Sequence, residues 1–156
     1  MTEQKTHRTV SPEIVAHDFA TSMHGAMDQR KIDATVEALL SSQTGYPATL
    51  TTWGAPLPWT KFEVAITGGK TFRGGIWRGN GNRIARPGDD TESAPGMVYT
   101  DDIDALYNNT VSCQYNATVA YVNINWFDGD SNLLGNFQAA TPSTLVGVGG
   151  GSGSWS

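Results

Sequence analysis

The chain has 156 residues, of which 18 are glycine and only 16% are charged. This length predicts one domain with a single core, and the glycine-rich, charge-poor composition favours a β-protein over a helical bundle. The formal net charge of −5 argues against a nucleic-acid partner and predicts no electrostatic attraction to anionic lipid.

The sequence gives little sign of membrane insertion or export. No apolar run approaches the roughly 20 residues that a membrane-spanning helix needs. The polar N-terminus lacks an apolar segment, so we recognise no signal peptide. Two alternatives stay open: the protein is cytoplasmic, or a leader has been replaced at the start of the chain.

Residues 1–30 are expected to form a helical or flexible segment ahead of the main domain. Ser11 can cap a helix, Pro12 suits its first turn, and the acidic Glu13 interacts favourably with the helix dipole. Apolar residues follow at helical spacing. We therefore predict a helix over about residues 12–28.

Two histidines on this segment raise the question of a metal site. His17 and His24 would share a helix face with Asp28, as metal ligands or as a solvated polar face. No third strong ligand lies at a spacing that metal sites favour, so we favour the solvated face and expect no metal. The chain also lacks a phosphate loop and a dinucleotide fingerprint, and we expect no cofactor.

Residues 31–40 fit two periods. Ile32, Val36 and Leu39 suit a helix, whereas the apolar residues at every second position suit a strand. The glycine-rich barrel context favours a strand. We therefore expect a barrel domain over residues 31–156.

Prolines argue against a central strand in residues 41–60, because proline cannot donate to a strand ladder. The prolines are Pro47, Pro56 and Pro58. Trp53 and Trp59 flank Pro56 and Pro58, and the two tryptophans form either an aromatic recognition lip or a cover for the core. We favour the cover.

The clearest hairpin spans residues 61–79. Apolar side chains alternate along both arms, and Gly68-Gly69 supplies a loop with free backbone torsions. Residues 79–96, rich in glycine and charge, are expected to form a long loop.

A short helix is expected after Thr100. Asp101 and Asp102 place acids in its first turn, and Asn108-Asn109 is expected to end it in the left-handed conformation.

The run from Val111 to Phe137 is the most strand-like part of the chain. Its apolar face switches after Ala120, which requires a bulge, a bend or a strand end. Residues 128–132 predict a plain hairpin turn in preference to a calcium site, since no acid follows where an EF-hand requires one. Cys113 occupies an apolar strand position and is predicted to be a small core side chain, not a nucleophile.

Two further patterns indicate a narrow, duplicated barrel. Glycines recur at every second position from Gly147 to Gly153, which lets another backbone or a large side chain approach closely. A faint repeat relates residues 64–76 to residues 124–137, on either side of the helix near residues 101–109.

Residues 98–155 resemble the virulence-associated (Vap) proteins of actinobacterial pathogens. The motifs that carry the resemblance are Tyr99-Thr100-Asp101-Asp102, Asn123-Ile124-Asn125, Phe127-Asp128-Gly129 and the glycine-rich end at Ser154-Trp155. The resemblance implies an all-β fold: an eight-stranded antiparallel barrel with a short helix between its halves and a lumen packed with side chains. It also implies a secreted effector of the host phagosome with no established enzymatic activity.

Two functional hypotheses follow. The first is a non-enzymatic effector barrel that acts through its surface on a host membrane or protein. The second is a cytoplasmic barrel that binds an apolar small molecule, or a cyclase or isomerase that holds its substrate in a reactive conformation within an apolar lumen. For the second, the candidate lining residues are Arg73, Trp77, Tyr115 and Tyr121.

Overall fold

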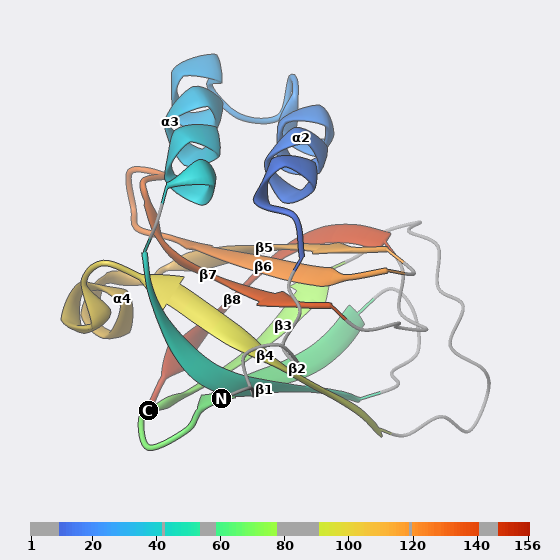
Figure 1. Ribbon diagram of the computed structural model, residues 1–156, viewed down its shortest axis with the longest axis vertical. Coiled ribbons are helices and arrows are strands. Elements are labelled where there is room, and N and C mark those ends of the chain that lie inside the picture. Colours follow the sequence, from blue (N-terminus) through green and yellow to red (C-terminus); the bar gives the residue numbers. More distant parts are fainter. Residues whose placement is uncertain (1–9, 42, 54–58, 78–90, 119, 141–146) are drawn as a thin grey trace.

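The computed structural model describes residues 10–41, 43–53, 59–77, 91–118, 120–140 and 147–156. Eight antiparallel strands close into a barrel, and two helices pack against its outside (Figure 1). We call α2 (Pro12–Met23) and α3 (Gln29–Leu40) the helix pair. The strands are β1 (Thr44–Trp53), β2 (Trp59–Ile66), β3 (Thr71–Trp77), β4 (Thr91–Thr100), β5 (Ser112–Ala117), β6 (Val122–Phe127), β7 (Leu133–Ala139) and β8 (Gly147–Trp155).

The barrel has two related halves. Around the ring the strands run β1-β2-β3-β8-β5-β6-β7-β4, and β4 returns to β1. The short helix α4 (Ile103–Asn109) joins β4 to β5. The hairpins β2–β3 and β6–β7, which contain the two repeated sequence segments, occupy equivalent places in the two halves. The expected fold class, a closed eight-stranded barrel with a helix between its halves, is confirmed.

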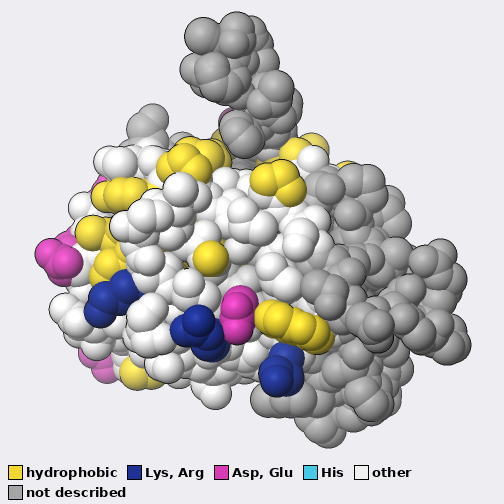
Figure 2. All heavy atoms as spheres, turned by 90° about the horizontal axis from the view of Figure 1, so that it is seen from below, with side chains coloured by type: hydrophobic (Ala, Val, Ile, Leu, Met, Phe, Trp, Pro, Cys, Tyr) yellow, Lys and Arg dark blue, Asp and Glu magenta, His cyan; other side chains and the backbone are white. Residues whose placement is uncertain are grey.

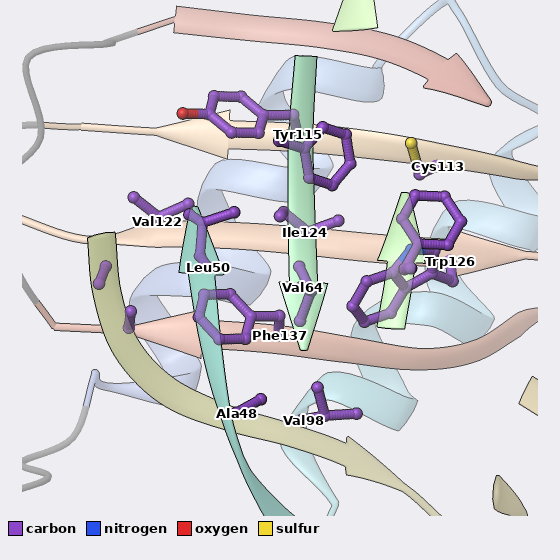
Figure 3. Close-up of a cluster of buried hydrophobic side chains, with 14 of the residues drawn as sticks. Ala48, Leu50, Val64, Val98, Cys113, Tyr115, Val122, Ile124, Trp126 and Phe137 are labelled. Atoms are coloured by element: carbon purple, nitrogen blue, oxygen red, sulfur yellow. The ribbon is translucent and has the colours of Figure 1, made fainter. Parts of the chain in front are cut away.

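Alternation along the strands separates the barrel interior from its outer surface. On β6, Val122, Ile124 and Trp126 point inward and join the main core, as Figure 3 shows. Asn123 and Asn125 take the alternate positions and are nevertheless fully buried. They are buried because the helix pair covers the outer face of β5, β6 and β7 (Figure 1).

The prediction of a strand over residues 31–40 is wrong, because this stretch lies within α3. The helical period prevails because Ile32, Thr35 and Leu39 form one buried stripe. The first strand begins only at Thr44. The helix predicted over residues 12–28 is present but shorter, ending at Met23, two residues before Gly25, which has φ +83°.

Two prolines lie within strands, contrary to the prediction. Pro47 belongs to β1 and Pro95 to β4, although residues 41–60 were not expected to form a central strand and residues 79–96 were expected to form a loop. Each proline lies just before a second ladder begins: β1 pairs with β2 from Ala48, and β4 with β7 from Met97. A missing N–H is therefore tolerated at both positions. Residues 79–90 of the predicted loop fall outside the described residues.

The remaining elements follow the sequence pattern. The hairpin β2–β3, the helix α4 and the strands β5 to β7 are confirmed. The apolar face switches near Ala120 because β5 ends at Ala117 and β6 returns antiparallel to it from Val122. The expected left-handed stop at Asn109 is wrong, since Ser131 is the one residue other than glycine with positive φ in the described part of the chain.

Candidate functional site

The interior of the barrel is filled by aromatic rings that meet across it. Phe62 on β2 lies 6.4 Å from Tyr115 on β5, centroid to centroid, and Trp126 on β6 lies 5.0 Å from Trp155 on β8. Neither pair of strands is adjacent in the ring, so these rings meet inside the barrel, above the strands that separate them. Figure 3 shows Tyr115 and Trp126 among the aliphatic side chains that occupy the rest of this space.

Of the candidate lining residues, the described side chains place Tyr115 alone in the interior, where it is 1% exposed. Arg73 lies on the outer wall, because Phe72 beside it points inward and successive strand residues alternate. Tyr121 lies outside the barrel, beneath the helix pair. The side chain of Trp77 falls outside the described residues. The interior therefore does not bring these four residues together.

Cys113 is a core side chain, as predicted. It is 4% exposed, and burial raises the pKa of its thiol to about 12, although a hydrogen bond with the backbone of Gly151 acts in the opposite direction. At neutral pH the thiol stays protonated, and only the thiolate is a strong nucleophile.

The face beneath the helix pair carries a network of amide side chains that we call the amide grid. Its members are Gln114, Asn116, Asn123, Asn125, Asn136 and Gln138. Strand pairing sets them in two rows across β5, β6 and β7, with Gln114 opposite Asn125 and Asn116 opposite Asn123.

The members of the amide grid bond mainly to one another. The Nδ2 atom of Asn125 donates to Oε1 of Gln114 at 3.0 Å, and Nε2 of Gln138 donates to Oδ1 of Asn136 at 2.8 Å. Nδ2 of Asn123 also donates to the carbonyl oxygen of Phe137 at 3.1 Å. Buried amides are costly unless they are hydrogen-bonded, and this network supplies the partners. The alternation of amides along these strands is a signal that sequence reasoning missed.

The helix pair is attached to this face by a second, smaller core. Phe19 of α2 stacks on Phe127 of β6 with ring centroids 6.2 Å apart. The Tyr121 hydroxyl donates to the Asp18 carboxylate, and the pKa of Tyr121 lies well above its ordinary value because of burial and because of the neighbouring carboxylate. Lys31 of α3 donates to the Asn132 side chain at 2.9 Å.

The turn between β6 and β7 is organised by Asp128. Its Oδ1 atom accepts from the backbone N–H groups of Asp130 at 2.8 Å and Asn132 at 3.0 Å. Partial burial raises the pKa of Asp128, but these hydrogen bonds and the nearby Lys31 outweigh it and leave the pKa below its usual value. The carboxylate of Asp128 therefore accepts hydrogen bonds from within the turn, as expected for a plain hairpin turn. Within the described ranges, no group of three or more His, Cys, Asp or Glu residues could hold a metal ion.

The outer surface opposite the helix pair carries a hollow of about 390 Å³. Trp53, Lys61, Glu63 and Arg73 line it, and we call these four residues the β2–β3 wall. Arg73 pairs with Glu63 at 3.1 Å and donates to the Ser156 hydroxyl at 2.9 Å. Figure 2 views the molecule from this side and shows basic side chains beside an acidic one, among hydrophobic and uncharged groups.

Charge is distributed unevenly along the chain. Residues 59–77 contain Lys61, Lys70 and Arg73 but only one acid, Glu63, although the whole chain has a net charge of −5. This hairpin is therefore locally basic. We based the expectation of no attraction to anionic lipid on the charge of the whole chain. That charge differs in sign from the local charge of this hairpin.

A family model described as Rhodococcus equi virulence-associated protein matches residues 3–156. The chain belongs to this virulence-associated protein family. The match extends well beyond residues 98–155, on which the sequence resemblance rested, and it includes the helix pair of this Vap protein.

Two solved structures are similar to this chain. VapB from the intracellular pathogen Rhodococcus equi is 36% identical, with a TM-score of 0.63, over 74% of this chain and 98% of that chain. VapD from the same organism is 31% identical, with a TM-score of 0.64, over 74% of this chain and 100% of that chain. A search of curated proteins found no match. Among the described residues of this Vap protein, no helix is long and apolar enough to cross a membrane.

Proposed function

We propose that this Vap protein is a non-enzymatic effector that acts through its outer surface on a host membrane or protein. One observation carries the proposal: aromatic side chains from non-adjacent strands touch across the described interior, which leaves the barrel wall as the working surface. Secretion, which family membership favours, is part of the same proposal.

The alternative, a cyclase, isomerase or small-molecule binder with an apolar lumen, has less support. It needs a lumen that can hold a substrate, whereas Tyr115 is packed against Phe62 and Arg73 lies outside. The thiol of Cys113 is also buried and protonated. Among the described residues, no specific feature of the interior favours catalysis.

The β2–β3 wall is the part of the surface that we propose makes the contact. Trp53 is partly buried and lies opposite Lys61 in the β1–β2 ladder, and Glu63 lies opposite Arg73 in the β2–β3 ladder. Tryptophan and arginine are the residues most enriched at energetically important interface positions. Lysines near an anionic surface contribute about 1 kcal/mol each.

The test measures retention of the fluorescently labelled full chain on permeabilised phagocytic host cells. Lys61→Glu reverses one charge of the β2–β3 wall, and Arg30→Glu is the matched single charge reversal on the exposed part of α3. The wall variant should lose retention by about tenfold or more, while the control should not. Equal retention of wild type and both variants would contradict the proposal.

The same variants distinguish the two kinds of target. Retention that survives protease treatment of the cells, together with co-sedimentation with phosphatidylcholine–phosphatidylserine vesicles, would identify a membrane. Retention that protease abolishes, with no co-sedimentation, would identify a protein.

A further inference from the structure

A groove of about 360 Å³ opens where the helix pair meets β4 and β7, at the free edge of the amide grid. Its polar lining consists of Ser41, Gln43, Tyr99, Asn136 and Gln138. Tyr99 and Asn136 lie directly opposite each other in the β4–β7 ladder, so the phenol ring borders the last amides of the grid. This volume falls at the lower end of the roughly 300–1,000 Å³ that small-molecule sites occupy.

Among the described residues that line the groove, none has an ionised side chain. Every polar residue that lines it is a hydroxyl, an amide or a phenol, and the remaining lining residues are aliphatic or proline. An amide both donates and accepts hydrogen bonds, as does an alcohol. An ionic ligand would lose its hydration here without finding a counter-charge, whereas a neutral ligand rich in hydroxyls would find matching partners.

The amides at the edge of the groove are held in place before any ligand arrives. Asn136 is 1% exposed, and its Oδ1 atom accepts from Nε2 of Gln138 at 2.8 Å. Behind them the rest of the amide grid is hydrogen-bonded and buried. Groups that are already ordered lose less conformational entropy when they bind, which favours affinity.

One side of the groove is apolar. Leu39, Leu40 and Pro12 line it, and Leu40 stays 48% exposed although it is a large hydrophobic residue. A saccharide ring presents hydroxyls at its edge and C–H groups on its faces. The groove matches both features, with amides for the hydroxyls and an aliphatic wall for a ring face.

We propose that this groove binds a neutral saccharide of one or two rings. Gln138 and Tyr99 bond its hydroxyls, and Leu40 packs against its C–H face. The proposal goes beyond the surface role described above and does not depend on it, because the β2–β3 wall contributes no residue to this groove.

Saturation-transfer NMR on the full chain tests the proposal, with methyl glycosides of glucose, mannose and galactose and with maltose and cellobiose as probes. At least one probe should receive saturation. Gln138→Leu, which keeps the side-chain size and removes the hydrogen-bonding groups, should weaken binding of that probe by about tenfold. Gln29→Leu is the matched control, since Gln29 is exposed at the opposite end of α3 and does not line the groove.

A second variant guards against misfolding of the first. Leu40→Ser alters an exposed residue, and it should also weaken binding severalfold while leaving the fold intact by circular dichroism. The proposal is overturned if no probe receives saturation, or if Gln138→Leu and Leu40→Ser bind as well as Gln29→Leu does.

Discussion

The ring of Phe72 on β3 lies 5.6 Å from the ring of Trp126 on β6, although two strands, β8 and β5, separate β3 from β6 in the barrel. Edge-to-face contacts of this kind add to the energy of burial. They also bring side chains of the two walls together at this level of the described interior. This packing of the interior is the basis of the proposed surface function.

Trp126→Ala should destabilise the barrel strongly. Trp126 is fully buried and contacts both Phe72 and Trp155, so its removal leaves a cavity that the rigid wall cannot fill. We expect a loss of about 3–5 kcal/mol in the free energy of unfolding, measured by chemical denaturation. Ile14→Ala, at a side chain that is 53% exposed, is the control and should cost far less. Similar losses for the two variants would contradict the packed interior.

Gly151→Ala should disturb the contact between β8 and β3. A Cβ atom at Gly151 would overlap with the carbonyl oxygen of Gly75, and backbone cannot move aside as a flexible side chain can. We expect chemical denaturation to show a loss of about 1–3 kcal/mol in the free energy of unfolding, or the variant to fail to fold. A Cβ atom at Gly129 would have nothing within 4 Å, so Gly129→Ala should change stability by about 1 kcal/mol at most. A tolerated Gly151→Ala would show that the two strands are further apart.

The thiol of Cys113 should be unreactive in the native protein. Burial raises its pKa to about 12, so at pH 8 a disulfide reagent such as dithionitrobenzoate should react only after unfolding in guanidinium.

The same pKa shift links Cys113 to stability. Because the folded-state pKa is raised, the stabilisation is fully present below the ordinary thiol pKa of about 8.5 and is lost as the pH rises toward about 12. Rapid reaction of the folded protein with dithionitrobenzoate at pH 8 would show that the thiol of Cys113 is accessible, and it would contradict the raised pKa on which both expectations rest.

Phe19→Ala should loosen the helix pair while leaving the barrel closed. Phe19 is fully buried, and its stacking on Phe127 is a main apolar contact between α2 and β6. Limited proteolysis followed by mass spectrometry should show faster cleavage between α2 and α3, at residues 24–28. The strands from β1 to β8 should stay protected. Faster cleavage within β6 itself would instead indicate that the barrel needs the helix pair to fold.

The barrel could be predicted from the sequence where one period dominated. Residues 112–139 alternate so regularly that β5, β6 and β7 follow from the pattern alone. Residues 31–40 could not be assigned, because their ten residues satisfy both a strand and a helix. Only packing of Ile32 and Leu39 onto the barrel decides for the helix. The strand positions of Pro47 and Pro95 were missed for a related reason. A strand tolerates a proline where no neighbouring strand needs its N–H group, and this depends on where the neighbouring ladders begin.

The site was harder to predict than the fold. Tyr115 and Tyr121 were both plausible lining residues, yet β5 ends between them, and they therefore lie on opposite sides of the wall. The amide grid left a visible pattern of Asn and Gln at alternating positions. That pattern normally indicates a solvated face, and only the docking of the helix pair makes it a buried one.

A crystal structure of the full chain under xenon pressure tests the central claim most directly. Xenon enters apolar cavities that are larger than a water molecule. We expect no xenon site among Phe62, Phe72, Tyr115 and Trp126, because their rings already meet across the lumen. An ordered xenon atom, or any bound apolar molecule, between these rings would contradict a filled barrel. That result would favour the alternative function, a barrel that binds a small molecule in its interior.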